Sequence, residues 1–544
     1  MPRKAKMHSI RITAQQARAL WVGLAVLTGC QHFERADHPG LQRHSDAAVA
    51  ALDPPGRPTP AVPERVAPTL HESPELPMQE VSFADVPEAD DFADASDTEY
   101  LLLSDVILSV YDSYPLFEVA LRERDVAAGR EIAAWGEFDT GLKAYSVTNP
   151  MGFYKRYRTS AKLDQPLYAG GNVYAGYKIG RGAFHPAWYD DQTDLGGEFS
   201  LGVGMPLLKD RVIDQRRSGV MQASLARQAV EPAIQAEWLA FVRDASQTYW
   251  AWVGAGQVLD ANRELLRLAE DRVEQIEQRV LVGDLERIAR IDNERLIALR
   301  ETKVIESQRK LEMAAIKLSL FLRTPDGRPQ LPTGELLPES FPVPDPPDSQ
   351  QMQQDIQTAL TTRPELVELD LLLQQIRIEL AQAENSLLPK LDAVVGVSQD
   401  VGQPVNVRRT KSFFELEAGV YGEMPLQWRE ARGKLLATRG KLMQVNATRE
   451  FMADRVVADV QDALSALEAA AGQIEQTAKN LQLSREALEL GRFAFDAGDI
   501  DLIVLNIYEQ AVADAAIAWI EAQTYYFAAQ ADYQAALARD PFAP

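Results

Sequence analysis

Few residues in this chain of 544 have side chains suited to covalent or metal chemistry. It has one cysteine, Cys30, and six histidines, five of them at or before His71. His32, His38 and His44 recur every six residues, the kind of spacing that can bind a metal, but we expect no second shell to hold them. His185 stands alone, without the spacing of a hydrolase triad or a zinc site. We therefore predict neither an enzyme nor a metal or cofactor site.

The segment before Cys30 is typical of an exported protein. Residues 19–29 are apolar apart from Thr28, and the basic residues before them have no acidic neighbours. This run is too short for a permanent span, which needs about 20 residues. Leu27-Thr28-Gly29-Cys30 resembles the bacterial lipobox, in which the chain is cut before the cysteine and the sulfur takes a diacylglyceride. We expect residues 1–29 to be a lipoprotein signal peptide and Cys30 to insert lipid into a membrane. By the same resemblance Gln31, which is not Asp, favours the outer membrane.

The charge and the composition of the next segment limit its role. A net charge of −23 argues against nucleic acid as a partner, since binding phosphates needs clustered Lys and Arg. Residues 30–97 are rich in proline and acids and have little hydrophobic periodicity. Such a segment cannot bury enough surface to offset chain entropy, so we predict a disordered tether.

From about residue 98 the sequence repeats itself. A first repeat, 98–322, and a second, 351–540, each read as helix, strands, long helix, turn and helix, and a proline-rich linker, 323–350, joins them. The matching landmarks are the helix starts Tyr114-Pro115 and Arg363-Pro364, the strand ends "GMPLL" (204–208) and "EMPLQ" (423–427), and the turns "VGDLE" (282–286) and "AGDID" (497–501).

The helices are unusually long. The uninterrupted helical runs 214–282 and 430–496 each predict a helix of about 100 Å, and shorter helices about half that length are expected to stack beside them. Gly283 and Gly498 suit the left-handed position that closes a helix, and Asp284 and Asp499 suit the N-cap of the next one.

The strands, expected within 138–207 and 389–426, alternate in polarity. In 412–424, Phe414, Leu416, Ala418 and Val420 share one face and Glu415 and Glu417 the other. Transmembrane barrel strands alternate in this way, and so do the strands of a soluble sandwich. Four or six strands cannot enclose a roomy barrel, since about eight are needed merely to pack an interior. A barrel would therefore need strands from several chains. About 30 extra residues in the first repeat are placed in a hairpin around Gly170-Gly171.

Together these features resemble the TolC-like outer membrane factor family. The resemblance implies a mainly helical α+β fold and a homotrimer in which each protomer gives four strands to a twelve-stranded outer-membrane barrel, continued by an α-helical barrel in the periplasm. It implies a passive exit duct for tripartite efflux or type I secretion, with a periplasmic adaptor and an inner-membrane pump as partners. The tips that would meet the adaptor are Gly283, Asp284, Leu285, Gly498, Asp499 and Ile500.

Two features depart from the family pattern. The insertion between 150 and 195 adds either an external hairpin or two more barrel strands. The acidic residue that often narrows the periplasmic entrance is displaced, so that Asp292, Asp501 and Asn506 become the candidates for a gate.

Two other readings remain open. A lipid-anchored coiled-coil scaffold would not need amphipathic strands, and a periplasmic adaptor would carry one helical hairpin rather than two full repeats. Glu294 and Glu509, at equivalent places in the two repeats, are explained by helix solvation or interhelical pairing rather than catalysis. Trp238, Tyr249, Trp250 and Trp252 are expected to belong to a helical core.

Overall fold

The computed structural model describes residues 100–540 apart from 154, 185–190, 284, 346, 348 and 406–412. The predicted signal peptide, Cys30, the tether, His185 and Asp284 lie outside the described residues. Within them, no group of three or more His, Cys, Asp or Glu side chains is arranged to hold a metal ion.

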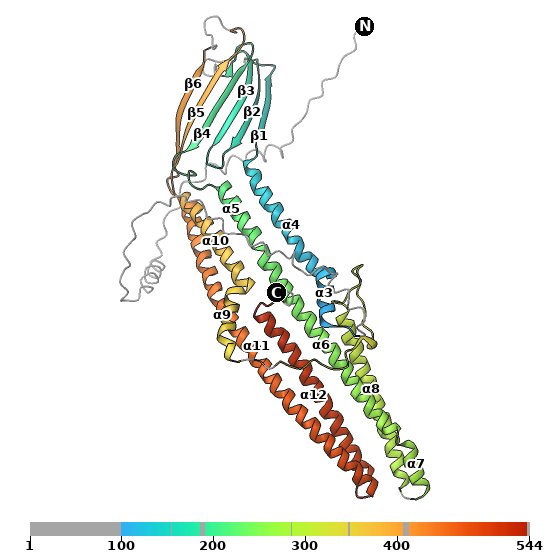
Figure 1. Ribbon diagram of the computed structural model, residues 1–544. Coiled ribbons are helices and arrows are strands. Elements are labelled where there is room, and N and C mark those ends of the chain that lie inside the picture. Colours follow the sequence, from blue (N-terminus) through green and yellow to red (C-terminus); the bar gives the residue numbers. More distant parts are fainter. Residues whose placement is uncertain are drawn as a thin grey trace, which may run out of the picture. The chain divides into compact units, whose positions relative to one another are not determined.

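The chain builds two sets of helices that extend from one end of a single sheet (Figure 1). Prolines begin α4 and α10 at their first helical position, where a missing N–H costs nothing. The 3-10 turns η3 (Gly136–Phe138), η5 (Gly334–Leu336) and η6 (Ser349–Gln351) connect longer elements. The first set comprises α3 (Leu103–Ser113), α4 (Pro115–Trp135), α5 (Gln215–Gln228), α6 (Val230–Glu270), α7 (Val273–Leu281) and α8 (Arg287–Leu318), and the second comprises α9 (Met352–Thr362), α10 (Pro364–Asn385), α11 (Arg429–Ala497) and α12 (Leu502–Ala536).

The two long helical runs differ. The prediction of one uninterrupted helix over 214–282 was wrong, because the run is divided into α5, α6 and α7. Pro232, in the first turn of α6, has no N–H to offer the carbonyl of Gln228, where α5 ends. At the second break the Arg272 side chain donates from Nε to the Leu268 carbonyl at 3.0 Å. In contrast, α11 runs for 69 residues without interruption, or about 100 Å.

Six antiparallel strands form one sheet in the order β1-β2-β3-β4-β5-β6. The strands are β1 (Gly141–Asn149), β2 (Arg156–Pro166), β3 (Asn172–Gly182), β4 (Glu198–Pro206), β5 (Lys390–Asp400) and β6 (Glu415–Glu423). The inserted hairpin, β2–β3, turns through Gly170 and Gly171, whose φ angles are +99° and +82°. It pairs with β1 on one side and β4 on the other. The hairpin is therefore an integral part of the sheet rather than an external appendage.

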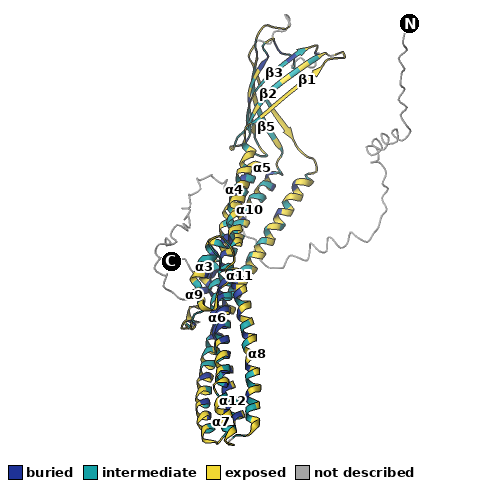
Figure 2. Cartoon of the chain, turned by 90° about the vertical axis from the view of Figure 1, so that its right-hand side faces the viewer, coloured by how far each residue is buried: buried dark blue, intermediate teal, exposed yellow. Residues whose placement is uncertain are grey.

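An aromatic core ties the helices and the linker together. Trp250 of α6 stacks on Phe527 of α12 and on Phe341 of the linker, with ring centroids 4.5 and 5.8 Å away. Tyr526 donates a hydrogen bond to the Asp345 carbonyl, also in the linker. The expectation that Trp238, Tyr249, Trp250 and Trp252 are core residues is confirmed, because all four are buried. Buried residues gather where the helices pack together around α6 (Figure 2).

Of the described helices, α12 alone is long and apolar enough to cross a bilayer by length and composition. It packs along α11 and against α6, and its buried side chains include Tyr526, Phe527 and Tyr533. This packing covers only part of the helix, since 28% of its most apolar 18-residue window is buried.

Candidate functional site

The turn between α11 and α12 is set by one glycine and one aspartate. Gly498 closes α11 with φ +83°, which confirms the predicted left-handed position. The Asp499 N–H then returns to the Ala494 carbonyl at 2.8 Å, so Asp499 belongs to the end of α11. The predicted N-cap at Asp499 was wrong: Asp501 caps α12 and accepts from the Val504 N–H at 2.9 Å. Ile500 lies between the two helices.

The turn between α7 and α8 also contains a glycine in the left-handed conformation. Gly283 adopts φ +78°, as predicted. The Leu285 N–H donates to the Arg279 carbonyl at 3.1 Å, and the N-cap of α8 is Glu286. The N-cap predicted at Asp284 is therefore also displaced by two residues, because the chain needs extra length to leave the left-handed turn.

The three gate candidates enter separate contacts within the chain. Asp292 lies 3.7 Å from Arg295 on its own helix, and Asp501 serves as the N-cap. The Asn506 Oδ1 accepts from Arg272 at 3.2 Å. Through Arg272, Asn506 contacts a buried cluster that links the α7–α8 and α11–α12 hairpins. The gate itself stays a prediction.

That cluster is one carboxylate between two arginines. Glu509 of α12 accepts from Arg272 at 2.5 Å and from Arg300 of α8 at 3.0 Å. The side chains of Glu509, Arg300 and Arg272 are 3%, 2% and 11% exposed, so all three are largely removed from water. Burial lowers the pKa of Arg300, and the hydrogen bond that Arg300 donates to Glu509 opposes this shift. The interhelical pairing expected for Glu509 is confirmed.

Neighbouring groups complete the cluster. Arg300 also donates to the Leu265 carbonyl of α6 at 2.6 Å, and Asn293 of α8 donates to the Ala269 carbonyl at 3.1 Å. The cluster therefore joins α6, α8 and α12 close to both turns. Glu294, the counterpart of Glu509 in the first repeat, is 60% exposed and pairs with Arg290 on its own helix at 3.4 Å. Sequence reasoning missed both arginines, since nothing local distinguishes them from the other arginines on these helices.

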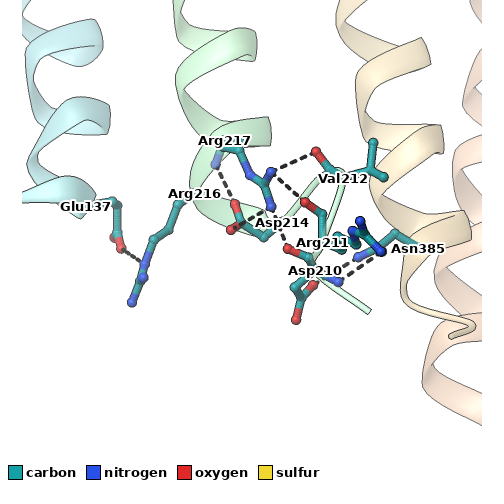
Figure 3. Close-up of polar contacts among 8 residues, drawn as sticks. All are labelled: Glu137, Asp210, Arg211, Val212, Asp214, Arg216, Arg217 and Asn385. Carbon is teal, nitrogen blue, oxygen red and sulfur yellow. Dashed lines mark hydrogen bonds and ion pairs between the residues drawn. The ribbon is translucent and has the colours of Figure 1, made fainter. Parts of the chain in front are cut away.

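A second polar assembly holds the connection between β4 and α5 (Figure 3). Arg217, buried at the start of α5, donates to the carbonyls of Asp210, Arg211 and Val212 at 2.5–2.9 Å. Asp214 caps α5 by accepting from the Arg217 N–H at 2.8 Å. Asn385 at the end of α10 exchanges hydrogen bonds of 2.9 and 3.0 Å with Asp210. The strand exit of the first repeat is thus tied to a helix of the second.

The sheet has two chemically different faces. Cross-strand pairing places an apolar row across all six strands, running Leu142, Leu163, Ala175, Leu201, Val397 and Leu416. The adjacent row on the opposite face runs Lys143, Lys162, Gly176, Ser200, Ser398 and Glu415. Along β2 the apolar-face residues are exposed while those of the polar face are partly covered, with Leu163 48% exposed.

This architecture is similar to that of several solved structures. The open state of the Neisseria gonorrhoeae MtrE outer membrane channel aligns with 80% of this chain and 89% of its own length. The sequence identity is 16% and the TM-score is 0.56. The Campylobacter jejuni CmeC outer membrane channel matches over 80% of this chain and 85% of its own, with 13% identity and a TM-score of 0.56. The outer membrane protein VceC from Vibrio cholerae matches over 80% and 96%, with 13% identity and a TM-score of 0.57.

The chain has the TolC-like fold. No protein-family model matches the sequence, and no curated protein matches it either. Identities of 13–16% show a shared fold rather than a shared activity. In the TolC-like fold of this chain, the described strands come from both repeats, and β4 and β5 join the two repeats within one sheet.

Proposed function

We propose that this protein is a homotrimeric outer-membrane exit duct that passively conducts substrate from an inner-membrane pump and a periplasmic adaptor to the exterior. The fold supports this role, since the solved structures named above are described as outer membrane channels or proteins. The lipid on Cys30 would assist delivery to the outer membrane.

The observation that carries the proposal is the two-faced sheet. Its apolar rows are exposed, with Phe199, Leu201 and Leu416 between 52% and 68% accessible. A soluble protein would cover such a face, whereas lipid would solvate it. Within the described chain β1 and β6 are edge strands, and open edges are not tolerated in hydrocarbon. The proposal satisfies both requirements when further copies complete the wall.

The helical tips support contact with a partner protein. Leu281 and Val282 at the first turn are each 78% exposed, and Ile503 and Ile507 after the second are 56% and 61% exposed. These apolar side chains stand beside the residues assigned to adaptor contact. Exposed apolar groups gathered at the end of a helical hairpin are typical of a protein interaction site.

Purified full-length protein reconstituted in a planar lipid bilayer tests the proposal. We expect discrete, long-lived conductance steps without any added energy source. In parallel, the Cys30→Ser variant should remain in membranes washed with alkaline carbonate, because strands rather than lipid hold it there. A protein that conducts no current and is released by carbonate after Cys30→Ser would instead be an anchored scaffold.

A further inference from the structure

The two edges of the sheet have matching lengths. β1 and β6 are each nine residues long, and within the described chain neither has a strand on its outer side. Each edge therefore offers a row of backbone donors and acceptors to a new strand. β1 leads away from η3 and β6 leads into α11, so Gly141 and Glu423 both lie at the helical end of the sheet.

The register of the six strands contains a measurable stagger. A row followed from Gly141 passes through Asp164, Tyr174, Gly202 and Gly396 and reaches Glu417 on β6. β6 ends at Glu423, six residues further along. The distance along the strand between this row and the helical end of the sheet, which we call the helical rim, thus grows by about 1.2 residues for each strand crossed. With a rise of about 3.4 Å per residue and a spacing of about 4.8 Å, this corresponds to strands tilted by about 40° to the normal of the rim. Transmembrane barrels tilt by roughly 35–45°.

The same stagger predicts how the next strand must pair. If a seventh strand continues the helical end of the sheet at the same slope, the residue opposite Glu417 lies about seven positions from that strand's own end. This number is the shift between the row and the new strand. Only an even shift keeps apolar residues on one face, because a slip of one residue exchanges the faces. The choice is therefore six or eight. A shift of six pairs all nine residues of both strands, whereas a shift of eight leaves two residues of each strand unpaired.

We propose that β6 pairs antiparallel with β1 of a second copy of this chain, with Gly141 opposite Glu423 and Asn149 opposite Glu415. Three such seams close a wall of eighteen strands, to which each β2–β3 hairpin contributes two. This deepens the proposed function and rests on it. A wall of 16–18 strands encloses an aqueous channel, so the hairpin widens the mouth beyond the twelve strands that the family resemblance implies.

The side chains fit this register. On the apolar face it sets Ala144 opposite Val420 and Thr148 opposite Leu416. On the polar face Lys143 of one copy stands opposite Tyr421 and diagonal to Glu423, within reach of its carboxylate. In the described part of the chain Glu423 forms no ion pair, because Lys390, directly across from it in the sheet, lies 3.5 Å from Asp392 instead. Opposite charges thus meet where the seam joins the helical rim.

Paired cysteines across the seam test the register. Val147→Cys with Glu417→Cys samples the proposed register on the polar face, and Ser146→Cys with Ala418→Cys samples it on the apolar face. The two pairs also cover both kinds of antiparallel neighbour, hydrogen-bonded and not. Val147→Cys with Gly419→Cys and Val147→Cys with Glu415→Cys are matched controls for shifts of eight and four.

After mild oxidation of the reconstituted protein, we expect covalent dimers and trimers from the first two pairs, at least tenfold more than from either control pair. Each single-cysteine variant should stay monomeric in denaturing gels, which excludes a contribution from Cys30. Preferential cross-linking of Val147→Cys to Gly419→Cys, or none at all in protein that conducts current, overturns the register while leaving the duct intact. If neither the parent chain nor any variant conducts current, and no cysteine pair cross-links, the proposed function is overturned as well.

Discussion

Neutralising Glu509 should loosen the tips. Its carboxylate is the common partner of Arg272 and Arg300, and it holds α12 against α8 and the break between α6 and α7. In Glu509→Ala both guanidinium groups lose their counter-charge while staying buried. Removing one member of a buried ion pair costs about 3–5 kcal/mol, and two arginines depend on this one carboxylate, so we expect the upper half of that range. Glu509→Gln keeps the shape and one acceptor and should cost about 2–3 kcal/mol.

The assay must report on local opening, because a chain of this size does not unfold in a single step. Hydrogen exchange of the amides in α7, the first turns of α8 and the first turns of α12 measures the opening free energy there. We expect protection in these segments to fall by at least a hundredfold in Glu509→Ala, while the aromatic core around Trp250 keeps its protection.

Glu294→Gln is the matched control. Glu294 occupies the equivalent place in the first repeat but is exposed, so its loss should cost less than about 0.5 kcal/mol. Replacing all three members with apolar residues, as in Arg272→Met, Arg300→Met and Glu509→Leu, should cost less than Glu509→Ala alone. Equal exchange in Glu509→Ala and Glu294→Gln would show that the buried cluster does not hold the tips together.

Three further predictions concern single positions. Gly498→Ala and Gly283→Ala should each destabilise their turn by about 1–2 kcal/mol, because a Cβ at either place meets no atom but the backbone stays left-handed. Gly433→Ala, in the second turn of α11 with equally open space, should stabilise the protein by about 0.5–1 kcal/mol. Calorimetric midpoints that move in one direction for all three variants would contradict this. Arg217→Met should lower the free energy of unfolding by about 2–4 kcal/mol, because its hydrogen bonds to backbone carbonyls are lost. The control Arg216→Met, which removes a guanidinium 3.9 Å from Glu137, should lower it by less than about 0.5 kcal/mol. Similar thermal midpoints for the two variants would be inconsistent with this account. Asp501→Ala should cost about 1 kcal/mol in the first turn of α12 and Asp499→Ala only a few tenths, measured by amide exchange, and the reverse order would show that the cap is misassigned.

Local signals in the sequence were sufficient for many elements. Pro115 and Pro364 start helices because their rings suit a first turn, and Gly283 and Gly498 end them because they adopt positive φ. The alternation in 412–424 predicted β6 since a half-buried strand has period two. In each case the residue's own conformational preference decides the outcome, so the neighbouring chain is not needed to find it.

Features that depend on distant partners could not be predicted in this way. Arg272 and Arg300 acquire their role from Glu509, more than 200 positions away, and no spacing rule connects them. The placement of β2–β3 within the sheet was undecided because a hairpin's own sequence does not show what lies on either side of it. The caps at Asp501 and Glu286 shifted by two residues because left-handed turns use extra chain.

The uneven division of the two long helical runs gives the molecule unequal mechanical compliance. α11 is a single rod from Arg429 to Ala497, so a force applied at its tip is transmitted along about 100 Å toward β6 with little bending. The corresponding path through α7, α6 and α5 has joints at Arg272 and Ala229, where a similar force is absorbed within one turn. We therefore expect the α7–α8 tip to bend independently of the sheet more readily than the α11–α12 tip, which one continuous helix joins to β6.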